Sequence, residues 1–417
     1  MIMWMTMLTS FAPRQIDRQT AGGVGVVIAI GVVYLVALQG DRALPVFWAL
    51  GVAFGFIVQR SRFCFVAGFR DLFLMYQGRM MRGILAGLVV ATLGFAMIMA
   101  TVVPNPGNGV LPSDAHILPL GIATVVGGVM FGIGMVLAGG CVSGTLYRMG
   151  EGYVGSWVAL GGVMVGLYAM NRTWNWWWDV SISSDVFVWL PTSLSYTGAL
   201  VLTLGLLALT LLAVGWWEKR SPYAGFTVPI TVRHASGEPA APTNDLARLY
   251  RTVFRTEWTP ITGGALLAVV NVLLFIRYRP LGVVGEISRW SSDIADSAGA
   301  GVGTLKGLDG LAGCVSRVTD GTWFTDAFML NAGIIVGAFA AALLSREFKL
   351  RVPRQRRRYV QSLGGGVVMG YGAGLGLGCT IGAFFSAIPS LALNGWVYAA
   401  SLAVGAYIGV VIIRRFP

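Results

Sequence analysis

Long apolar stretches alternate with short polar segments along most of this chain. Ten of them approach the roughly 20 residues that an α-helix needs to cross the hydrocarbon core of a bilayer. They lie at residues 21–38, 43–59, 83–102, 119–138, 153–170, 196–217, 260–276, 327–344, 361–377 and 391–413. The pattern predicts an all-α polytopic membrane protein with about ten apolar segments.

The amino-acid composition is also typical of a membrane protein. The mean hydropathy is +0.72, and only 12% of the 417 residues are charged. The formal charge of +12 would suggest nucleic acid as the partner of a soluble protein. Here the Lys and Arg residues gather in a few short segments between apolar runs, as the positive-inside rule expects, and no nucleic-acid partner is implied.

The basic segments predict the orientation of the chain. Arginines crowd the stretch between the second and third apolar segments, and residues 346–358 are the most basic part of the sequence. The 103–118 loop has no Lys or Arg, and the 171–195 loop contains Trp174, Trp176, Trp177 and Trp178, as an outer aromatic belt would. We therefore expect a multi-pass protein of a bacterial inner membrane with both termini in the cytoplasm. The first apolar run lacks a convincing signal-peptide cleavage site and is expected to remain as the first span.

The chain divides by composition into two apolar halves. Residues 218–259 are rich in Lys and Arg and contain Pro, Ser and Gly, as a cytoplasmic linker would. The expected organisation is a transmembrane half at 1–217, a basic linker at 218–259 and a second transmembrane half at 260–417.

A glycine-rich sequence around a cysteine occurs twice. Residues 127–144, "GGVMFGIGMVLAGGCVSG", share nine of eighteen identities with residues 365–382, "GGVVMGYGAGLGLGCTIG". The alignment pairs Cys141 with Cys379 and Gly140 with Gly378. A second alignment, at an offset of 250 residues, pairs Cys64 with Cys314. The four cysteines of the chain thus form two repeated pairs.

The expected topology inverts the second copy, because an odd number of crossings separates segment 83–102 from segment 327–344. Inverted repeats with interrupted, glycine-rich segments are how many transporters build a site near the membrane midplane. The glycines permit re-entrant elements whose half-helix N-termini would point N–H groups at an anion, with Gly140 and Gly378 beside the thiols. The alternative is that these glycines only let helices pack closely.

Thiols are weak, polarizable hydrogen-bond donors, suited to holding a soft sulfur-containing anion briefly. Cys64, Cys141, Cys314 and Cys379 are therefore candidate stations along a pathway, although buried cysteine also packs as a small hydrophobe. Arg62, Arg70 and Arg148 lie near these thiols in sequence and are candidates for drawing anions inward. Arginines at a membrane edge also serve orientation alone. The Cys and His spacings offer no metal cluster and the chain has no P-loop, so we expect no cofactor, metal or catalytic site.

Three segments resemble the YeeE/YedE family of membrane proteins: "GFIVQRSRFCFVAGFRDLFL", the stretch around Cys141, and the stretch around Cys379. Members of that family include bacterial thiosulfate-uptake transporters with an inverted-repeat, hourglass-like helical fold and a pathway lined by three cysteines. The resemblance implies that Cys64, Cys141 and Cys379 line such a pathway here. Cys314 lies outside the usual three and is supported only by the internal repeat.

The resemblance leaves the substrate open. The segment "GAFFSAIPSLALNGW" after Cys379 is similar to the YedE-type branch associated with selenium metabolism. The leading expectation is a permease that imports thiosulfate or a related sulfur anion, and the alternative is a transporter of a selenium species. A membrane thiol–disulfide redox protein and a non-transporting sensor are weaker alternatives. Family members often work beside a small TusA-like sulfur carrier, which would be a cytoplasmic partner.

Overall fold

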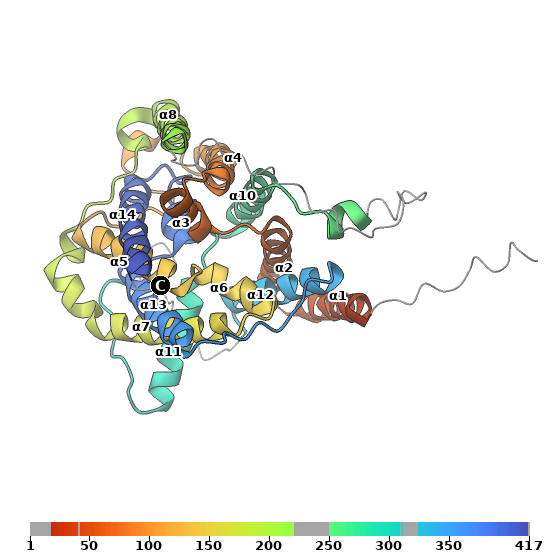
Figure 1. Cartoon of the computed structure of the whole chain (residues 1–417). Coiled ribbons are helices and arrows are strands. Elements are labelled where there is room, and N and C mark those ends of the chain that lie inside the picture. The colour runs from red at the N-terminus through yellow and green to blue at the C-terminus, as the bar shows by residue number, and fades with distance from the viewer. Residues whose placement is uncertain (1–17, 41, 221–249, 309–310, 312–323, 416–417) are drawn as a thin grey trace, which may run out of the picture.

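The chain folds into a bundle of helices (Figure 1). The computed structural model describes residues 18–40, 42–220, 250–308, 311 and 324–415. Within these residues the regular structure is helical, and β-pairing is limited to three isolated bridges.

Ten long helices correspond one to one with the ten predicted apolar segments. They are α1 (Arg18–Ala37), α2 (Ala43–Ser61), α4 (Arg79–Val102), α5 (Ile122–Ala138), α7 (Val154–Val180), α8 (Pro191–Lys219), α10 (Pro260–Arg277), α12 (Asp326–Leu344), α13 (Arg356–Leu375) and α14 (Leu393–Arg415). In the described part of the chain, nine helical stretches are long and apolar enough to cross a membrane. A pair bent by 47°, α13 with a short π-helix, makes a tenth. The prediction of an all-α polytopic membrane protein is confirmed.

Short helices follow several of the long ones, and the apolar pattern did not predict them. They are α3 (Phe65–Met75), α6 (Val142–Gly150), α11 (Val284–Ser297), the π-helices η4 (Arg251–Arg255) and η6 (Thr380–Ser386), and the 3₁₀ turns η2 (Pro106–Asn108) and η3 (Ile182–Ser184). Three of them, α3, α6 and η6, begin directly after a cysteine.

The long helices pack in two related sets. Helix α2 packs on α12, and α7 packs on α13. Helix α10 likewise packs on α4, and α14 packs on α5 (Figure 1). Exchanging α2, α4, α5 and α7 for α10, α12, α13 and α14 converts one set of contacts into the other. The same exchange relates the contact of α3 with α14 to the contact of α11 with α7.

Glycine makes the closest of these contacts possible. A Cβ added at Gly55 of α2 would collide with the Ile334 carbonyl of α12. Small residues let helix backbones approach in this way inside a membrane, where packing rather than water exclusion drives helix association. The close approach of α2 and α12 therefore requires a glycine at this position.

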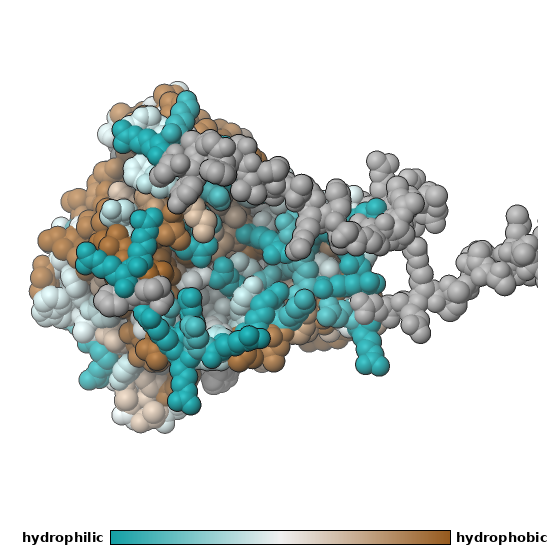
Figure 2. Space-filling model, viewed as in Figure 1, coloured by the Kyte–Doolittle hydropathy of each residue, from teal (hydrophilic) through white to brown (hydrophobic). Residues whose placement is uncertain are grey.

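Many helix ends meet at one face of the molecule. Gln19, at the start of α1, donates a hydrogen bond of 3.3 Å to the Phe348 carbonyl beyond the end of α12. Arg414, at the end of α14, donates one of 3.3 Å to the Leu74 carbonyl at the end of α3. Glu218, near the end of α8, accepts from the start of α4. In the view of Figure 2, long hydrophilic side chains gather across the middle of the molecule and hydrophobic residues lie around its edge.

The two predicted halves interlock. Each of the pairings α2 with α12, α4 with α10 and α7 with α13 joins the segment 1–217 to the segment 260–417. Most of the predicted linker, residues 221–249, lies outside the described residues. The boundaries at 217 and 260 stay a prediction about the sequence.

Candidate thiol-lined transport site

Three of the predicted cysteines occupy one kind of structural position. Cys64 is the residue before α3, Cys141 the residue before α6 and Cys379 the residue before η6, each with extended backbone. Their backbone carbonyls accept the first hydrogen bond of the following helix, from the N–H groups of Gly68 (3.1 Å), Thr145 (2.7 Å) and Ala383 (2.9 Å). Each thiol therefore sits at a helix N-terminus, where the backbone N–H groups create a positive end.

A left-handed residue lies two positions before each cysteine and ends the preceding helix. These residues are Arg62 (φ 49°), Gly139 (φ 75°) and Leu377 (φ 52°). Glycine adopts this conformation freely, whereas other residues are held there at a cost of about 1 kcal/mol or more. The same bend thus positions all three thiols, although only the one at Gly139 carries a glycine.

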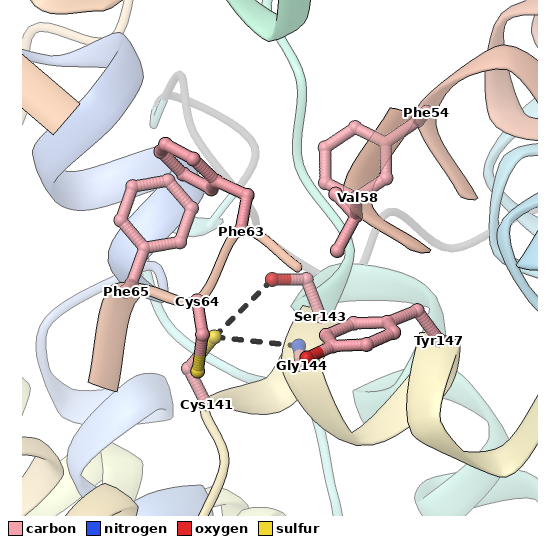
Figure 3. Close-up of a pocket in the computed structure, with 9 residues that line it drawn as sticks. All are labelled: Phe54, Val58, Phe63, Cys64, Phe65, Cys141, Ser143, Gly144 and Tyr147. Atoms are coloured by element: carbon pink, nitrogen blue, oxygen red, sulfur yellow. Dashed lines mark hydrogen bonds between the residues drawn. The ribbon is translucent and has the colours of Figure 1, made fainter. Parts of the chain in front are cut away.

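Cys64 and Cys141 line the same small cavity, with their side chains next to each other (Figure 3). The cavity measures about 10 Å³, which is room for about one water molecule. Its walls are mainly aromatic and aliphatic, from Phe54, Val58, Phe63, Phe65 and Tyr147. Both cysteines are buried thiols, 5% and 1% exposed. This thiol chamber is a small, largely apolar space with two thiols at one side.

The Cys141 thiol is held by the first turn of α6. Its Sγ accepts a hydrogen bond from the Gly144 N–H at 3.3 Å and lies 3.3 Å from the Ser143 hydroxyl (Figure 3). Thr145 donates to the Cys141 carbonyl at 2.9 Å. Sulfur is a weak acceptor, so the N–H groups of this turn remain available to a stronger acceptor such as an oxyanion.

The segment after Cys379 reaches the same region from the other half of the chain. The Cys379 Sγ accepts from the Ile381 N–H at 3.4 Å. The side chain of the next residue, Thr380, lies beside the Cys141 thiol. Its hydroxyl is fully buried and, apart from the weak contact with that thiol, makes no hydrogen bond within the described structure. An unsatisfied buried hydroxyl is unfavourable, and a polar ligand would relieve it.

Arg148 lies between the thiol chamber and the face of the molecule where many helix ends meet. Its Nη2 lies 3.8 Å from the Cys64 Sγ, its Nη1 donates to the Gly139 carbonyl, and its Nε donates to the Tyr147 hydroxyl at 3.3 Å. The guanidinium carbon lies 5.9 Å from the centre of the Tyr153 ring. Arg148 has no carboxylate within ion-pair distance among the described residues. The sequence prediction that Arg148 accompanies a thiol corresponds to a contact with Cys64, whereas sequence proximity had pointed to Cys141.

The other two predicted arginines, Arg62 and Arg70, form ion pairs with carboxylates. Arg62 is largely exposed and pairs with Glu257 (2.8 Å) and Glu347 (3.3 Å), away from the thiols. Arg70 pairs with its neighbour Asp71 at 2.8 Å.

The two predicted glycines differ as well. A Cβ at Gly140 would have ordinary contacts, with Arg148 Nη1 3.7 Å away, whereas a Cβ at Gly378 would come within 2.8 Å of the Ala383 nitrogen. Cys314 lies outside the described residues.

The sequence reasoning missed the hydroxyl groups of this site. Ser143 and Thr380 both follow a repeated cysteine, within two residues, in "CVSG" and "CTIG". A hydroxyl at the first turn after each cysteine was the available signal, and neither residue is identical between the two copies. Tyr147, one turn further along α6, likewise has no identical residue in the second copy.

The fold and this site together define a multi-pass, all-α membrane protein whose helix breaks gather thiols in its interior. A family model described as "Sulphur transport" matches residues 60–408. The chain belongs to this sulphur transport family, and the resemblance to YeeE/YedE proteins is confirmed.

Individual relatives cover most of the chain. The thiosulfate transporter TsuA of Escherichia coli K12 is 29% identical over 352 residues, 83% of this chain and 88% of that protein. The thiosulfate transporter TsuA of Spirochaeta thermophila is 29% identical over 358 residues, 84% of this chain and 92% of that protein. The probable transporter YedE of Salmonella typhimurium is 33% identical over 211 residues, 50% of this chain and 49% of that protein. Similarity to named transporters supports transport of a sulfur anion.

Proposed function

We propose that this protein is an inner-membrane permease that imports thiosulfate or a closely related sulfur anion past Cys64, Cys141 and Cys379. Two thiosulfate transporters that align with 83% and 84% of the chain support the substrate class. The observation that carries the proposal is structural. Two thiols share one cavity, and the segment that follows the third thiol places Thr380 beside it.

The chemistry of the chamber suits an anion with a soft sulfur end and a hard oxygen end. Thiol S–H groups donate weak hydrogen bonds and contact a polarizable sulfur favourably. The Gly144 N–H and the buried Thr380 hydroxyl are donors for sulfonate oxygens. Arg148 supplies positive charge at 3.8 Å from the Cys64 sulfur. Several weak contacts, rather than one strong site, allow an ion to bind and then to leave.

The chamber is too small for the substrate in this conformation. A space of about 10 Å³ holds about one water molecule, far less than a thiosulfate ion needs. Transport therefore requires the aromatic wall of Phe63, Phe65 and Tyr147 to move aside. Alternating exposure of a central site to the two sides of the membrane is the usual behaviour of transporters built from repeats.

We further propose that the two halves form an inverted repeat with its basic face in the cytoplasm. The exchange of helix contacts described above supports the repeat, and the basic loops support the orientation. That exchange pairs α3 with α11, so the N-cap residue Cys64 corresponds to Val283, the N-cap of α11. On this assignment three of four equivalent helix starts carry a cysteine, and Cys314 stands outside the set.

A second candidate substrate is a selenium species. The probable transporter YedE of Salmonella typhimurium shares 33% identity over half of the chain. The segment after Cys379 also resembles that branch. A small TusA-like sulfur carrier is the partner that we propose on the cytoplasmic side.

Uptake of sulfur-labelled thiosulfate into proteoliposomes tests the function directly. The full chain is compared with Cys64→Ala, Cys141→Ala and Cys379→Ala, with sulfate and selenite as competitors. Saturable uptake that each variant reduces at least tenfold supports a thiol-lined permease. Folded protein that transports labelled selenite but not thiosulfate would contradict the thiosulfate proposal and support the selenium alternative.

A further inference from the structure

A second and much larger cavity lies beside the thiol chamber. It measures about 610 Å³ and takes lining residues from α3, α5, α6, α7, α13, α14 and the segment between α12 and α13. Four arginines line it: Arg70, Arg148, Arg351 and Arg358. No aspartate or glutamate is among its described lining residues. We call this cavity the arginine vestibule.

Three of these arginines lack an acidic partner. Arg70 pairs with Asp71 at 2.8 Å, but Arg148, Arg351 and Arg358 have no carboxylate oxygen within 4.0 Å in the described structure. Glu151 interacts electrostatically with Arg148 and Arg351: burial raises the pKa of its carboxyl, and those arginines oppose the shift. The vestibule therefore carries an excess of positive charge.

Arg148 and Arg351 are held close together despite their like charge. Both guanidinium groups approach the ring of Tyr153, at 5.9 Å and 4.5 Å from its centre, so they lie within about 10 Å of each other. The Arg351 backbone pairs with the chain at Gly152 and Val154 through hydrogen bonds of 2.8 Å and 3.1 Å. Two like charges near one ring repel each other, and an anion that binds to both offsets the repulsion.

The vestibule also leads to the thiols. Arg148 lines the vestibule, and its Nη2 lies 3.8 Å from the sulfur of Cys64, which lines the thiol chamber. Arg351 uses one N–H at each terminal nitrogen, for the Glu151 carbonyl at 3.1 Å and the Glu347 carbonyl at 3.3 Å. A guanidinium has five N–H groups in a planar fork, so donors remain for an oxyanion.

We propose that the arginine vestibule is a second binding site for a small divalent oxyanion, formed by Arg148, Arg351 and Arg358 and distinct from the thiol chamber. The proposal rests on the proposed function, in which the same anion also occupies the thiols. The vestibule recognises the oxygens through guanidinium groups and does not require a sulfane sulfur. Sulfate, which lacks the soft sulfur end, therefore binds in the vestibule and not at the thiols.

Equilibrium binding to the full chain in detergent tests the second site, with labelled sulfate and labelled thiosulfate as probes. The test variant is Arg351→Gln/Arg358→Gln. The matched control is Arg354→Gln/Arg357→Gln, which removes two exposed arginines of the same basic segment that do not line the cavity. Arg358→Gln alone removes a side chain whose described hydrogen bond is a long one of 3.5 Å to Gln361, and so tests the site with little structural burden.

We expect one sulfate and two thiosulfate ions per wild-type chain. The double variant weakens sulfate binding at least tenfold and retains one thiosulfate, whereas the control changes sulfate affinity less than twofold. Cys141→Ser retains sulfate binding and loses one thiosulfate. Wild-type sulfate affinity in the double variant, or loss of sulfate binding in Cys141→Ser, would overturn the proposal.

The same experiment separates this site from its alternatives. Absence of thiosulfate uptake with intact sulfate binding contradicts the proposed function and leaves the vestibule site standing. Repeating the sulfate titration in nanodiscs of phosphatidylcholine and of phosphatidylglycerol distinguishes a free anion from a lipid phosphate. Equal binding in both supports a free-anion site, and loss of sulfate binding in phosphatidylglycerol alone assigns the arginines to a headgroup and overturns the proposal.

Discussion

At the residue scale, Cys141 has two roles that a single substitution to alanine removes together. Its thiol lines the chamber, and its Sγ also accepts the Gly144 N–H at 3.3 Å, which caps α6. Loss of a side-chain cap costs about 1 kcal/mol of stability. A defect in Cys141→Ala alone would therefore not show that thiol chemistry matters.

Cys141→Ser separates these roles. Serine is a good N-cap residue, so we expect the variant to unfold at a temperature no lower than that of the wild type. A hydroxyl is less polarizable than a thiol, and we expect thiosulfate uptake to fall at least tenfold. Thermal unfolding and proteoliposome uptake measure the two effects. Near-normal uptake by the serine variant would show that capping, rather than the sulfur atom, explains this cysteine.

Cys314→Ala provides the matched comparison within the same assay. Cys314 shares the offset of 250 residues with Cys64, lies outside the described residues and, unlike Cys141, does not belong to a segment that resembles the family. We expect Cys314→Ala to keep at least half of the wild-type uptake. Equal losses in Cys314→Ala and Cys141→Ala would contradict this ranking.

His116, in the loop between α4 and α5, predicts a pH dependence of stability. The buried ring lies with Nδ1 3.0 Å from the Gly382 carbonyl of η6. Burial lowers the pKa of His116 from 6.5 to about 4, the Arg279 charge adds to the shift, and the Gly382 hydrogen bond opposes it. Between these pKa values the unfolded chain binds a proton that the folded chain does not, so stability falls as the pH drops from 6.5 towards 4.

The expected loss for wild-type protein is about 2 kcal/mol by pH 5. His116→Asn keeps a donor near the position of Nδ1 but does not titrate, so its stability should change less between pH 7 and pH 5. Thermal unfolding in detergent at the two pH values compares the proteins. The same decrease in both would assign the acid sensitivity to other groups.

At the element scale, helix contact depends on a few glycines whose substitution has opposite expected effects. A Cβ at Gly55 would strike the Ile334 carbonyl of α12 and lie 2.8 Å from the Ala338 nitrogen, whereas a Cβ at Gly364 in α13 meets nothing within 4 Å. We expect Gly55→Ala to destabilise the protein by about 2 kcal/mol through overpacking. Gly364→Ala should stabilise it by about 0.5–1 kcal/mol, because alanine favours a helix interior.

Thermal unfolding of the two alanine variants in one detergent tests this contrast. The substitutions are chemically identical, so a difference between them reports the helix contact rather than the loss of a glycine. If both variants unfold at the same temperature, the close approach of α2 and α12 is not as tight as described.

At the scale of the whole molecule, the sequence predicted the long helices well because each long apolar run has one physical solution in a bilayer. It did not predict α11, because residues such as Glu286, Arg289 and Asp293 interrupt any apolar pattern there. In the fold they are satisfied by contacts distant in sequence or by each other, including Thr325 with Glu286 at 2.9 Å. Hydrogen bonds and ion pairs of this kind depend on the tertiary structure, so they leave little periodic pattern in the sequence.

The sequence likewise predicted those parts of the candidate site that are repeated, and not those that depend on three-dimensional contacts. The internal repeat put Cys141 and Cys379 in register, and the fold gives both the same N-cap position. An offset of 250 residues pairs Cys64 with Cys314, which lies outside the described residues, so this pairing stays a prediction. On the repeat that we propose, the helix contacts would instead relate Cys64 to Val283, which requires connecting loops of different length in the two halves. The hydroxyl of Thr380 and the contact of Arg148 with Cys64 depend on three-dimensional proximity and were invisible in the sequence.

The convergence of the segments before α3 and α6 at one chamber predicts a reversible redox block of transport. Cys64 and Cys141 lie side by side in one chamber (Figure 3), so diamide should take two protons and two electrons from their thiols and leave a disulfide. In a Cys314→Ala background, we expect uptake to fall at least tenfold and to recover with dithiothreitol, because the bridge removes both S–H donors and ties α3 to α6. Peptide mass mapping identifies the bridged pair. A Cys64–Cys141 disulfide formed in full without loss of uptake would mean that the anion does not pass between these thiols.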